Sequence, residues 1–366
     1  MIPYVNLKKQ YAEERKELLK IIDKTLASGL WVGGNEVEKF EKKIQQITNS
    51  KYCIALNSGT DALTLGLHLL NIKKGDEVIT APNSFIASTA VIIHLGAKPI
   101  FVDVKDDQNI DERKIEKLIT KKTKAIMPIH LTGRVCTMNK ILKISKKYKI
   151  PIIEDCAQSI LSKFNNKHAG TWGDVGCFST HPLKNLNASG DGGFVITNNK
   201  NIYSKMKNLR SHGMESNRDN VEEFGYVSRM DNIQAVILNY RIKNLKKIIK
   251  KRRKNVKLYL SNLNLNKIFF PLEKKEEFNT YHTFVIQVEK RDELKLYLKN
   301  HGILSTIHYP IPIHKQKSYL SLNTKYNECY PNTEKQAKRI LSLPINQYLT
   351  EKEIVKISKL INKFYN

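Results

Sequence analysis

Apolar and polar residues at the start of the chain alternate with the period of an α-helix. Apolar side chains from Tyr11 to Leu26 recur every third or fourth position, and those from Val37 to Ile47 repeat the pattern. The spacing therefore predicts two amphipathic helices, over residues 8–27 and 36–48.

Short β-rich runs alternate with helical stretches over the next 150 or so residues. The strands are expected at 53–56, 77–80, 99–103, 125–127, 151–154, 176–178 and 193–197, and the helices at 60–71, 85–95, 111–120 and 137–148. Alternation of this kind is typical of an α/β fold with a mostly parallel sheet covered on both faces.

The pattern changes near residue 250. Two helices, 199–210 and 229–250, close the first part of the chain. After them we expect a smaller α+β unit whose elements are a strand at 281–288, a helix at 291–300, a strand at 306–309 and a final helix at 350–364. The expected domains are residues 1–249, with the large sheet and the N-terminal helices, and residues 250–366.

Length and composition favour a globular enzyme. The chain has 366 residues, of which 41% are hydrophobic, so it can bury a large core. The most apolar stretch, 87–104, is interrupted by polar residues, glycine and proline, which argues against a membrane-spanning segment. The first residues lack the order of a signal peptide, and the five cysteines form no paired framework. We therefore expect a cytoplasmic protein with no membrane partner.

The net charge of +27 raises the question of nucleic-acid binding. The lysines are spread along the chain, and the dense run 246–254 has its isoleucines at helix-compatible positions. We interpret this run as the solvated face of a long helix, without the interleaved aromatic residues that stack on bases. No nucleic-acid partner is expected, although a basic field would attract an anionic substrate such as a nucleotide diphosphate.

Three loops after predicted strands carry candidate chemistry. Residues 57–60, Asn-Ser-Gly-Thr, open a helix and could cradle a phosphate, or simply cap that helix. Asp155 follows a strand and is either a loop acid or an acid directed into a ligand crevice. Lys184 lies between Pro182 and a glycine-rich turn. A lysine, a phosphate cradle and a carboxylate are together what pyridoxal phosphate requires, because the amine condenses with its aldehyde and the acid keeps its ring nitrogen protonated.

Ordered motifs resemble the sugar aminotransferases of the DegT/DnrJ/EryC1/StrS family over nearly the full chain. The resemblance implies the aspartate aminotransferase fold (fold type I), pyridoxal 5′-phosphate as cofactor, and active sites shared across a homodimer. The matching stretches are 30–41, 57–63, 75–80, 96–104, 153–158, 178–187, 190–193, 209–213 and 307–314.

By this resemblance, Lys184 is the catalytic residue that bonds to the cofactor and moves the substrate proton. Asp155 is similar to the family's partner of the ring nitrogen, and Gln158 to the residue near the phenolic oxygen. Phe85 occupies the position of an aromatic residue over the cofactor ring, with a core phenylalanine as the alternative.

The resemblance also implies a phosphate site and a substrate pocket. Gly59, Thr60 and Ser179 match phosphate ligands, with local capping as the alternative for the two hydroxyls. Where the family commonly has asparagine, this chain has Val227, so the neighbouring Arg229 is the expected contact to a partner subunit's phosphate or to a substrate carboxylate. His308 and Tyr309 resemble substrate-pocket residues, and a buried pair in the small domain is the alternative.

The implied reaction is transfer of an amino group, usually from glutamate, to a keto sugar for a surface polysaccharide such as lipopolysaccharide. A nucleotide-linked 3-keto-deoxysugar is the first expectation. Formation of 8-amino-3,8-dideoxyoctulosonate stays open, with Arg229 or Arg210 as partners for that sugar's carboxylate. A sugar dehydratase is disfavoured because that branch of the family has histidine in place of the lysine. A regulatory or nucleic-acid-binding relative without enzyme activity is the remaining alternative.

Overall fold

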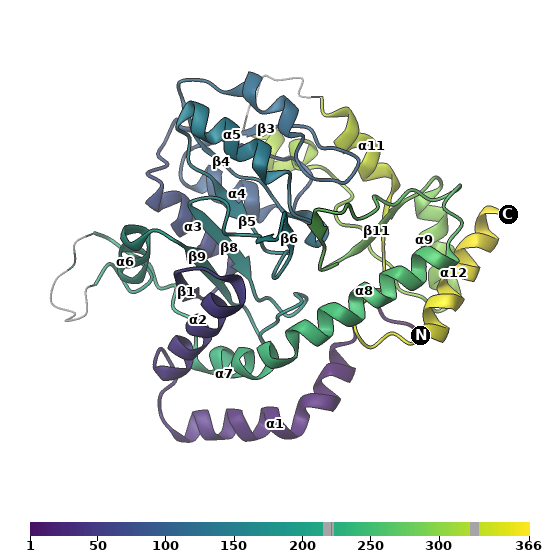
Figure 1. Ribbon diagram of the computed structural model, residues 1–366, viewed down its shortest axis with the longest axis horizontal. Helices are drawn as coiled ribbons and strands as arrows, with labels where there is room; N and C mark the ends of the chain where they lie inside the picture. Colours follow the sequence, from purple (N-terminus) through teal and green to yellow (C-terminus); the bar gives the residue numbers. More distant parts are fainter. Residues whose placement is uncertain (215–220, 222, 323–328) are drawn as a thin grey trace.

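The computed structural model describes residues 1–214, 221, 223–322 and 329–366 (Figure 1). Its centre is a run of strands in the spatial order β3-β2-β4-β5-β8-β9-β1, in which isolated parallel bridges between Ile126 and Ile152 and between Ile129 and Asp155 join β4 to β5. The bounds are β1 (Tyr52–Leu56), β2 (Glu77–Thr80), β3 (Lys98–Phe101), β4 (Thr123–Ile126), β5 (Ile153–Asp155), β8 (Val175–Ser179) and β9 (Gly193–Thr197).

One strand of this run opposes the others. β9 pairs antiparallel with both β1 and β8, whereas β2 is parallel to β3 and β4, and β5 is parallel to β8. The expectation of a mostly parallel sheet is therefore confirmed, and the carboxyl ends of the parallel strands meet along one edge.

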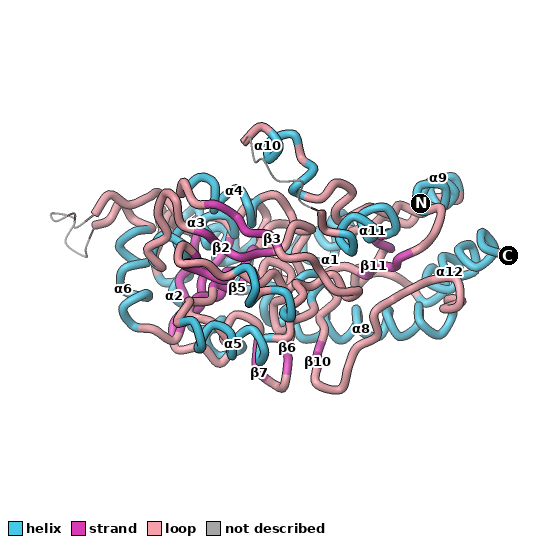
Figure 2. The backbone as a smooth tube through the Cα atoms, turned by 90° about the horizontal axis from the view of Figure 1, so that it is seen from above, coloured by secondary structure: helices cyan, strands magenta, loops and turns pink. Residues whose placement is uncertain are grey.

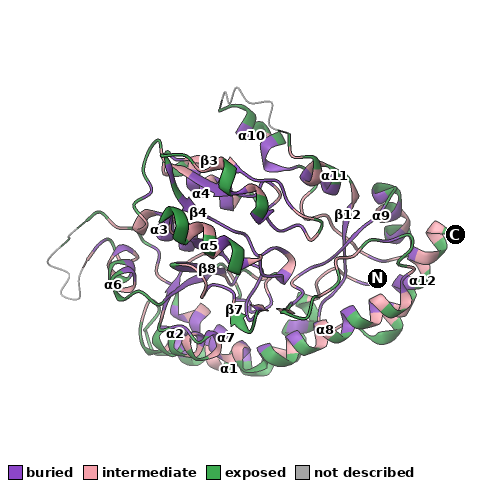
Figure 3. Ribbon diagram, turned by 45° about the horizontal axis from the view of Figure 1, so that its top comes forward, coloured by how far each residue is buried: buried purple, intermediate pink, exposed green. Residues whose placement is uncertain are grey.

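Helices cover both faces of the sheet, and the strands between them are buried (Figures 1 and 3). One core is completed by α2 (Asn35–Thr48), α5 (Met138–Tyr148) and α7 (Asn232–Arg241). The core on the opposite face is completed by α3 (Gly59–Leu69), α4 (Ala87–His94) and α6 (Lys200–Leu209). The long N-terminal helix α1 (Leu7–Ala27) packs on α7 through Leu18.

The C-terminal part builds a third core around a two-stranded antiparallel sheet of β11 (Phe284–Gln287) and β12 (Ile340–Leu343). Helices α8 (Leu245–Asn262), α9 (Arg291–Asn300) and α12 (Glu351–Tyr365) pack on it. Figure 2 shows the smaller elements at the margins, which are β6 (Lys163–Phe164), β7 (Lys167–His168), β10 (Glu277–Phe278), α10 (Lys317–Leu320) and α11 (Pro331–Arg339).

Helix α8 connects two of these cores. Leu245 and Ile249 belong to the core of the large sheet, whereas Val256 and Tyr259 belong to the C-terminal core. Ile2, at the start of the chain, also packs into the C-terminal core. The division at residues 249 and 250 stays a prediction, since one helix crosses that position without a break.

Several predicted elements differ from the structure. The stretch 111–120 forms two short 3₁₀ turns instead of a helix, and the Asp111 carboxylate accepts the Arg113 N–H at the start of the first turn. The helix expected at 229–250 is divided into α7 and α8 by a 3₁₀ turn at 242–244. Residues 306–309 contribute only an isolated bridge at Thr306, and the partner of β11 is β12, which was not predicted. Within the described ranges, no helix has the length and apolar character needed to span a bilayer.

Candidate active site

A cavity of about 440 Å³ lies where the carboxyl ends of the central strands meet the C-terminal part of the chain. Its walls include nine of the ten predicted site residues, namely Gly59, Thr60, Phe85, Asp155, Gln158, Ser179, Lys184, His308 and Tyr309. The tenth, Arg229, is not among the lining residues. Residues from positions 59 to 309 of the sequence therefore line one cavity, as the motifs predict. The role of each residue stays a prediction.

Lys184 lies in the loop between β8 and β9. Its backbone N–H donates to the His181 carbonyl at 2.8 Å, closing a turn that holds the side chain against the cavity. Burial lowers the pKa of the Lys184 amine from 10.5 to about 8, although the nearby Asp155 carboxylate opposes this shift. Near neutral pH roughly a tenth of such amines are unprotonated, far more than for a lysine in water.

Asp155 ends strand β5, and its side chain is buried beside the cavity. Oδ2 accepts the Ser88 hydroxyl at 2.7 Å, and Oδ1 accepts the Ala157 N–H at 3.0 Å. These bonds fix the carboxylate, so that it can hold a cationic ring nitrogen inside the cavity. Ser88 was not predicted, because one serine in the apolar stretch of α4 carries no distinctive spacing.

The amino end of α3 opens onto the same cavity. Ser58 caps this helix, since its hydroxyl accepts the Asp61 N–H at 3.0 Å. Gly59 packs so closely on β8 that a Cβ there would lie 2.6 Å from the Ser179 Cβ. Free backbone N–H groups at a helix start, beside the hydroxyls of Thr60 and Ser179, provide a site for a phosphate.

Gln158, Tyr309 and Phe85 form another part of the wall. The Gln158 Oε1 accepts the Thr132 N–H at 2.7 Å, and the Gln158 side chain lies close enough to the Tyr309 hydroxyl to affect its pKa. Burial raises the pKa of Tyr309 to about 12, so the phenol stays protonated. The Phe85 ring lies 5.9 Å from the Tyr309 ring and is 56% exposed, so Phe85 is not a core residue and can stack on a ligand ring.

Two imidazoles beside Lys184 are held neutral. Burial and the Lys184 charge lower the pKa of His308 to about 4, and its Nδ1 lies 2.9 Å from the Ser342 hydroxyl. Burial, followed by Lys184 and Arg252, lowers the pKa of His282 well below its ordinary value. His282 and Arg252, which also line the cavity, were missed in the sequence.

Two arginines proposed from the sequence lie elsewhere. The Arg210 guanidinium donates to the Glu41 carboxylate at 2.7 Å and to the Ala55 carbonyl at 2.8 Å, so a carboxylate partner is already present. Arg229 forms a backbone bridge with Leu56, which places it beside the α3 loop but outside the walls of this cavity. Arg210 is thus already paired and lies outside the walls of this cavity.

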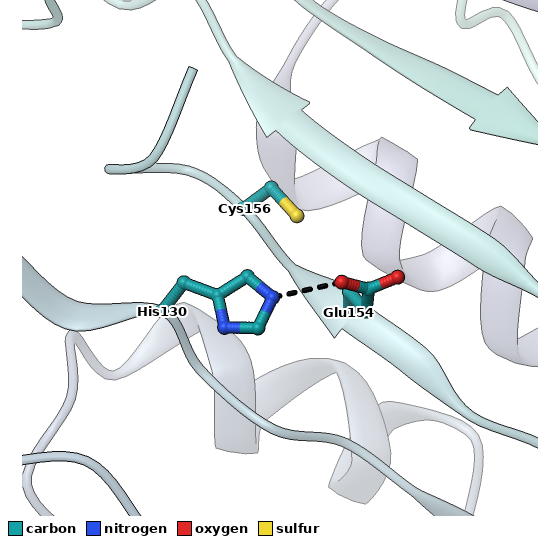
Figure 4. A group of neighbouring side chains, drawn as sticks. All are labelled: His130, Glu154 and Cys156. Carbon is teal, nitrogen blue, oxygen red and sulfur yellow. Dashed lines mark hydrogen bonds and ion pairs between the residues drawn. The ribbon is translucent and has the colours of Figure 1, made fainter. Parts of the chain in front are cut away.

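His130, Glu154 and Cys156 form a buried cluster beside Asp155 (Figure 4), and His130 also lines the cavity. His130 Nδ1 accepts the Cys136 N–H at 3.1 Å, so Nε2 carries the proton that it donates to Glu154 at 2.8 Å. The same carboxylate accepts the N–H groups of residues 170, 172 and 173. This saturated network ties the β4 loop to β5 and thereby positions Asp155.

The model of the DegT/DnrJ/EryC1/StrS aminotransferase family matches residues 12–362. A dTDP-3-amino-3,6-dideoxy-alpha-D-galactopyranose transaminase of Aneurinibacillus thermoaerophilus is 37% identical, covering 100% of this chain and 99% of the relative. A UDP-N-acetyl-3-dehydro-alpha-D-glucosamine 3-aminotransferase of Acidithiobacillus ferrooxidans is also 37% identical, covering 99% and 97%. A protein of Geobacillus stearothermophilus named a pleiotropic regulatory protein is 35% identical, covering 100% and 98%.

The fold has a solved counterpart. The crystal structure of DesV of S. venezuelae, in complex with a ketimine intermediate, superposes with a TM-score of 0.95 at 32% identity, covering 99% of this chain and 98% of that one. The fold type expected from the motifs is therefore confirmed.

Proposed function

Because the chain belongs to the DegT/DnrJ/EryC1/StrS family and is a pyridoxal-phosphate-dependent sugar aminotransferase, we propose that it moves an amino group from L-glutamate to carbon 3 of a nucleotide-linked keto-deoxysugar. The observation that carries this proposal is the shared cavity of Lys184, Asp155 and the amino end of α3. The residues fit the cofactor, since an amine of lowered pKa, a fixed carboxylate and a phosphate site face one enclosed space.

Each of these groups has a distinct task. Bound pyridoxal phosphate supplies an aldehyde that takes up the amino group and a ring that accepts the electrons of the substrate Cα–H bond. Asp155 would hold the ring nitrogen protonated, and residues 58–60 with Ser179 would hold the phosphate. With a pKa near 8, Lys184 can take a proton from the substrate carbon and return one at neutral pH.

The choice of sugar rests on the names of the two transaminases described above. Both carry the amino group at carbon 3 in their names, one on a dTDP sugar and the other on a UDP sugar. The net charge of +27 favours a substrate with a diphosphate. The engagement of Arg210 by Glu41 removes one of the two arginines considered for an octulosonate carboxylate.

We further propose a cytoplasmic homodimer that serves the synthesis of a surface polysaccharide. Large apolar side chains gather on the segment between α1 and α2, where Leu30, Trp31 and Val32 are each more than half exposed. This segment bonds to the start of α7, because the Trp31 carbonyl accepts the Asn232 N–H at 2.8 Å. Burial of this surface against a second copy would bring Arg229, which lies outside its own cavity, toward the partner's phosphate site.

A substrate panel tests the proposal. The purified holoenzyme is incubated with L-glutamate and either dTDP- or UDP-linked 3-keto sugars, 4-keto sugars, or a free 8-keto octulosonate, and 2-oxoglutarate release is measured. We expect turnover with 3-keto nucleotide sugars. Turnover with the octulosonate alone would replace this proposal with the alternative, and absence of turnover in a preparation that binds no pyridoxal phosphate would favour a regulatory protein.

A further inference from the structure

Arg252 of α8 is a buried charge with no acidic partner among the described residues. Its side chain is almost fully enclosed, with 4% of the residue exposed. Nη1 donates to the carbonyls of Tyr281 at 3.0 Å and His282 at 3.2 Å, and Nε has no hydrogen-bond partner. The Nε–Nη2 edge of the guanidinium therefore has no acceptor within the described ranges.

The other buried arginines of the described chain each have an acidic partner. Arg134 pairs with Glu277 at 2.6 Å, Arg241 with Glu14 at 2.8 Å, and Arg291 with Asp292 at 2.7 Å. Arg252 stands apart from all three, and burial lowers its pKa from 12.5 to about 10. An unpaired buried cation is strongly unfavourable, so a site of this kind is suited to an anionic ligand.

Arg252 faces the cavity of Lys184 from the C-terminal side. It shares that wall with Tyr4, His282, His308 and Asn346. Both Lys184 and Arg252 act on the His282 imidazole, which places the two cations around the same ring. Since both imidazoles are neutral near pH 7, Lys184 and Arg252 supply the positive charge at this end of the cavity.

The chemistry of the two substrates assigns an occupant to this end. The phosphate of the cofactor belongs at the start of α3, on the wall formed by the large sheet. An amino-acid donor must bring its amine to Lys184, and its α-carboxylate is one carbon away from that amine. We propose that Arg252 binds this carboxylate through its Nε–Nη2 edge, the geometry in which a planar guanidinium holds a carboxylate bidentately. This inference rests on the proposed aminotransferase function.

The neighbouring Arg253 provides a matched control. It lies one residue away on α8 and also donates to a backbone carbonyl, that of Asn279 at 2.8 Å. Unlike Arg252, it pairs with the Glu273 carboxylate at 2.6 and 2.9 Å and is absent from the cavity wall. The variants Arg252→Gln, Arg252→Lys and Arg253→Gln therefore separate a substrate contact from a general effect on α8.

We expect Arg252→Gln to raise the KM for glutamate about 10- to 100-fold, because it removes charge-assisted bonds to the carboxylate. Arg252→Lys should recover part of this loss, and the KM for a keto sugar without a carboxylate should not change. Arg253→Gln should leave both KM values within about twofold of those of the unaltered enzyme. An unchanged glutamate KM in Arg252→Gln would overturn the assignment, as would an increase confined to a carboxylated keto sugar.

A binding measurement adds a readout that needs no turnover. Maleate carries carboxylates but no amine, so it can occupy the subsite without reacting. We expect maleate to raise the melting temperature of the unaltered holoenzyme and of Arg253→Gln, and to have little effect on Arg252→Gln. Equal stabilisation of all three would contradict a carboxylate site at Arg252. If the holoenzyme binds maleate through Arg252 yet transfers no amino group, the proposed function fails and the subsite stands.

Discussion

Burial determines the protonation of the side chains around the cavity. It lowers the pKa of the Lys184 amine to about 8 and that of the His308 imidazole to about 4, and it raises the pKa of the Tyr309 phenol to about 12. At neutral pH the imidazole and the phenol are therefore uncharged, whereas the lysine readily exchanges a proton. The positive charge around the cavity therefore lies on Lys184, which we assign to the cofactor, and on Arg252, which we assign to a substrate carboxylate.

Acid should destabilise the protein through His308. Its pKa is about 4 in the folded state against 6.5 in the unfolded chain, so the unfolded state binds more protons between these values. The free energy of unfolding must therefore decrease as the pH falls from 6.5 to 4. We expect His308→Gln to reduce this decrease by about 1–3 kcal/mol.

Urea denaturation of the cofactor-free protein at pH 7 and pH 4.5 measures the effect. His94→Gln is the matched control, because His94 is exposed on the far end of α4. Parallel pH dependence in His308→Gln and the unaltered protein would show that the His308 imidazole is not held neutral by the fold.

At the scale of elements, the contact between β9 and the start of α3 shapes the phosphate site. Gly193 begins β9, and a Cβ there would lie 2.4 Å from the carbonyl carbon of Ser58 and 2.5 Å from the Gly59 nitrogen. The strand therefore packs directly on the backbone that would bind the phosphate. At Gly193, the glycine-rich turn after Lys184 is therefore required by the packing of β9 on the start of α3.

Gly193→Ala should displace the α3 start and weaken cofactor binding. We expect a loss of about 1–3 kcal/mol of stability and at least a tenfold increase in the Kd for pyridoxal phosphate, measured by titrating the visible absorbance. Gly190→Ala is the control, since its Cβ would meet only the flexible end of the Gln234 side chain at 3.0 Å. Equal Kd values for the two variants would contradict the contact between Gly193 and the start of α3 as the cause of weaker cofactor binding.

Much of the large sheet could be predicted because its strands and helices alternate with clear apolar patterns. All seven of its predicted strands overlap observed ones. In the C-terminal part, prediction failed where tertiary contacts decide the structure. Residues 340–343 form β12 because they pair with β11, and this short apolar run follows the preceding helix directly, without a turn between the two elements.

Nine residues of the cavity wall could be predicted because they lie in sequence motifs. Arg252 was not predicted, because its neighbours in the sequence are cations. The run 246–254 was interpreted as a solvated face, which is wrong for Arg252. The spacing itself distinguishes Arg252, since the buried positions 245, 249, 252, 256 and 259 form one helical stripe with a single charged member.

At the scale of the whole molecule, the exposed apolar segment between α1 and α2 is the surface that we propose for contact with a second subunit. Trp31 is 59% exposed and Leu30 is 60% exposed, whereas Trp172, the other tryptophan, is half-buried. Apolar side chains gathered in this way are typical of an interface between subunits.

Trp31→Glu should weaken the dimer that we propose. We expect sedimentation velocity to show a larger monomer fraction at micromolar protein, together with a loss of activity if the sites are shared. Leu296→Glu, at a position of α9 that is 58% exposed, is the matched control and should sediment as the unaltered protein does. A monomeric unaltered protein with full activity would contradict the shared site.

The most direct test of the account concerns the bond between Lys184 and the cofactor. The protein is reconstituted with pyridoxal phosphate, reduced with borohydride and digested, and the modified peptide is identified by mass spectrometry. We expect one phosphopyridoxyl group on Lys184, and no modification and no visible absorbance in Lys184→Ala. Stoichiometric modification of another lysine, or retained turnover in Lys184→Ala, would contradict the central claim.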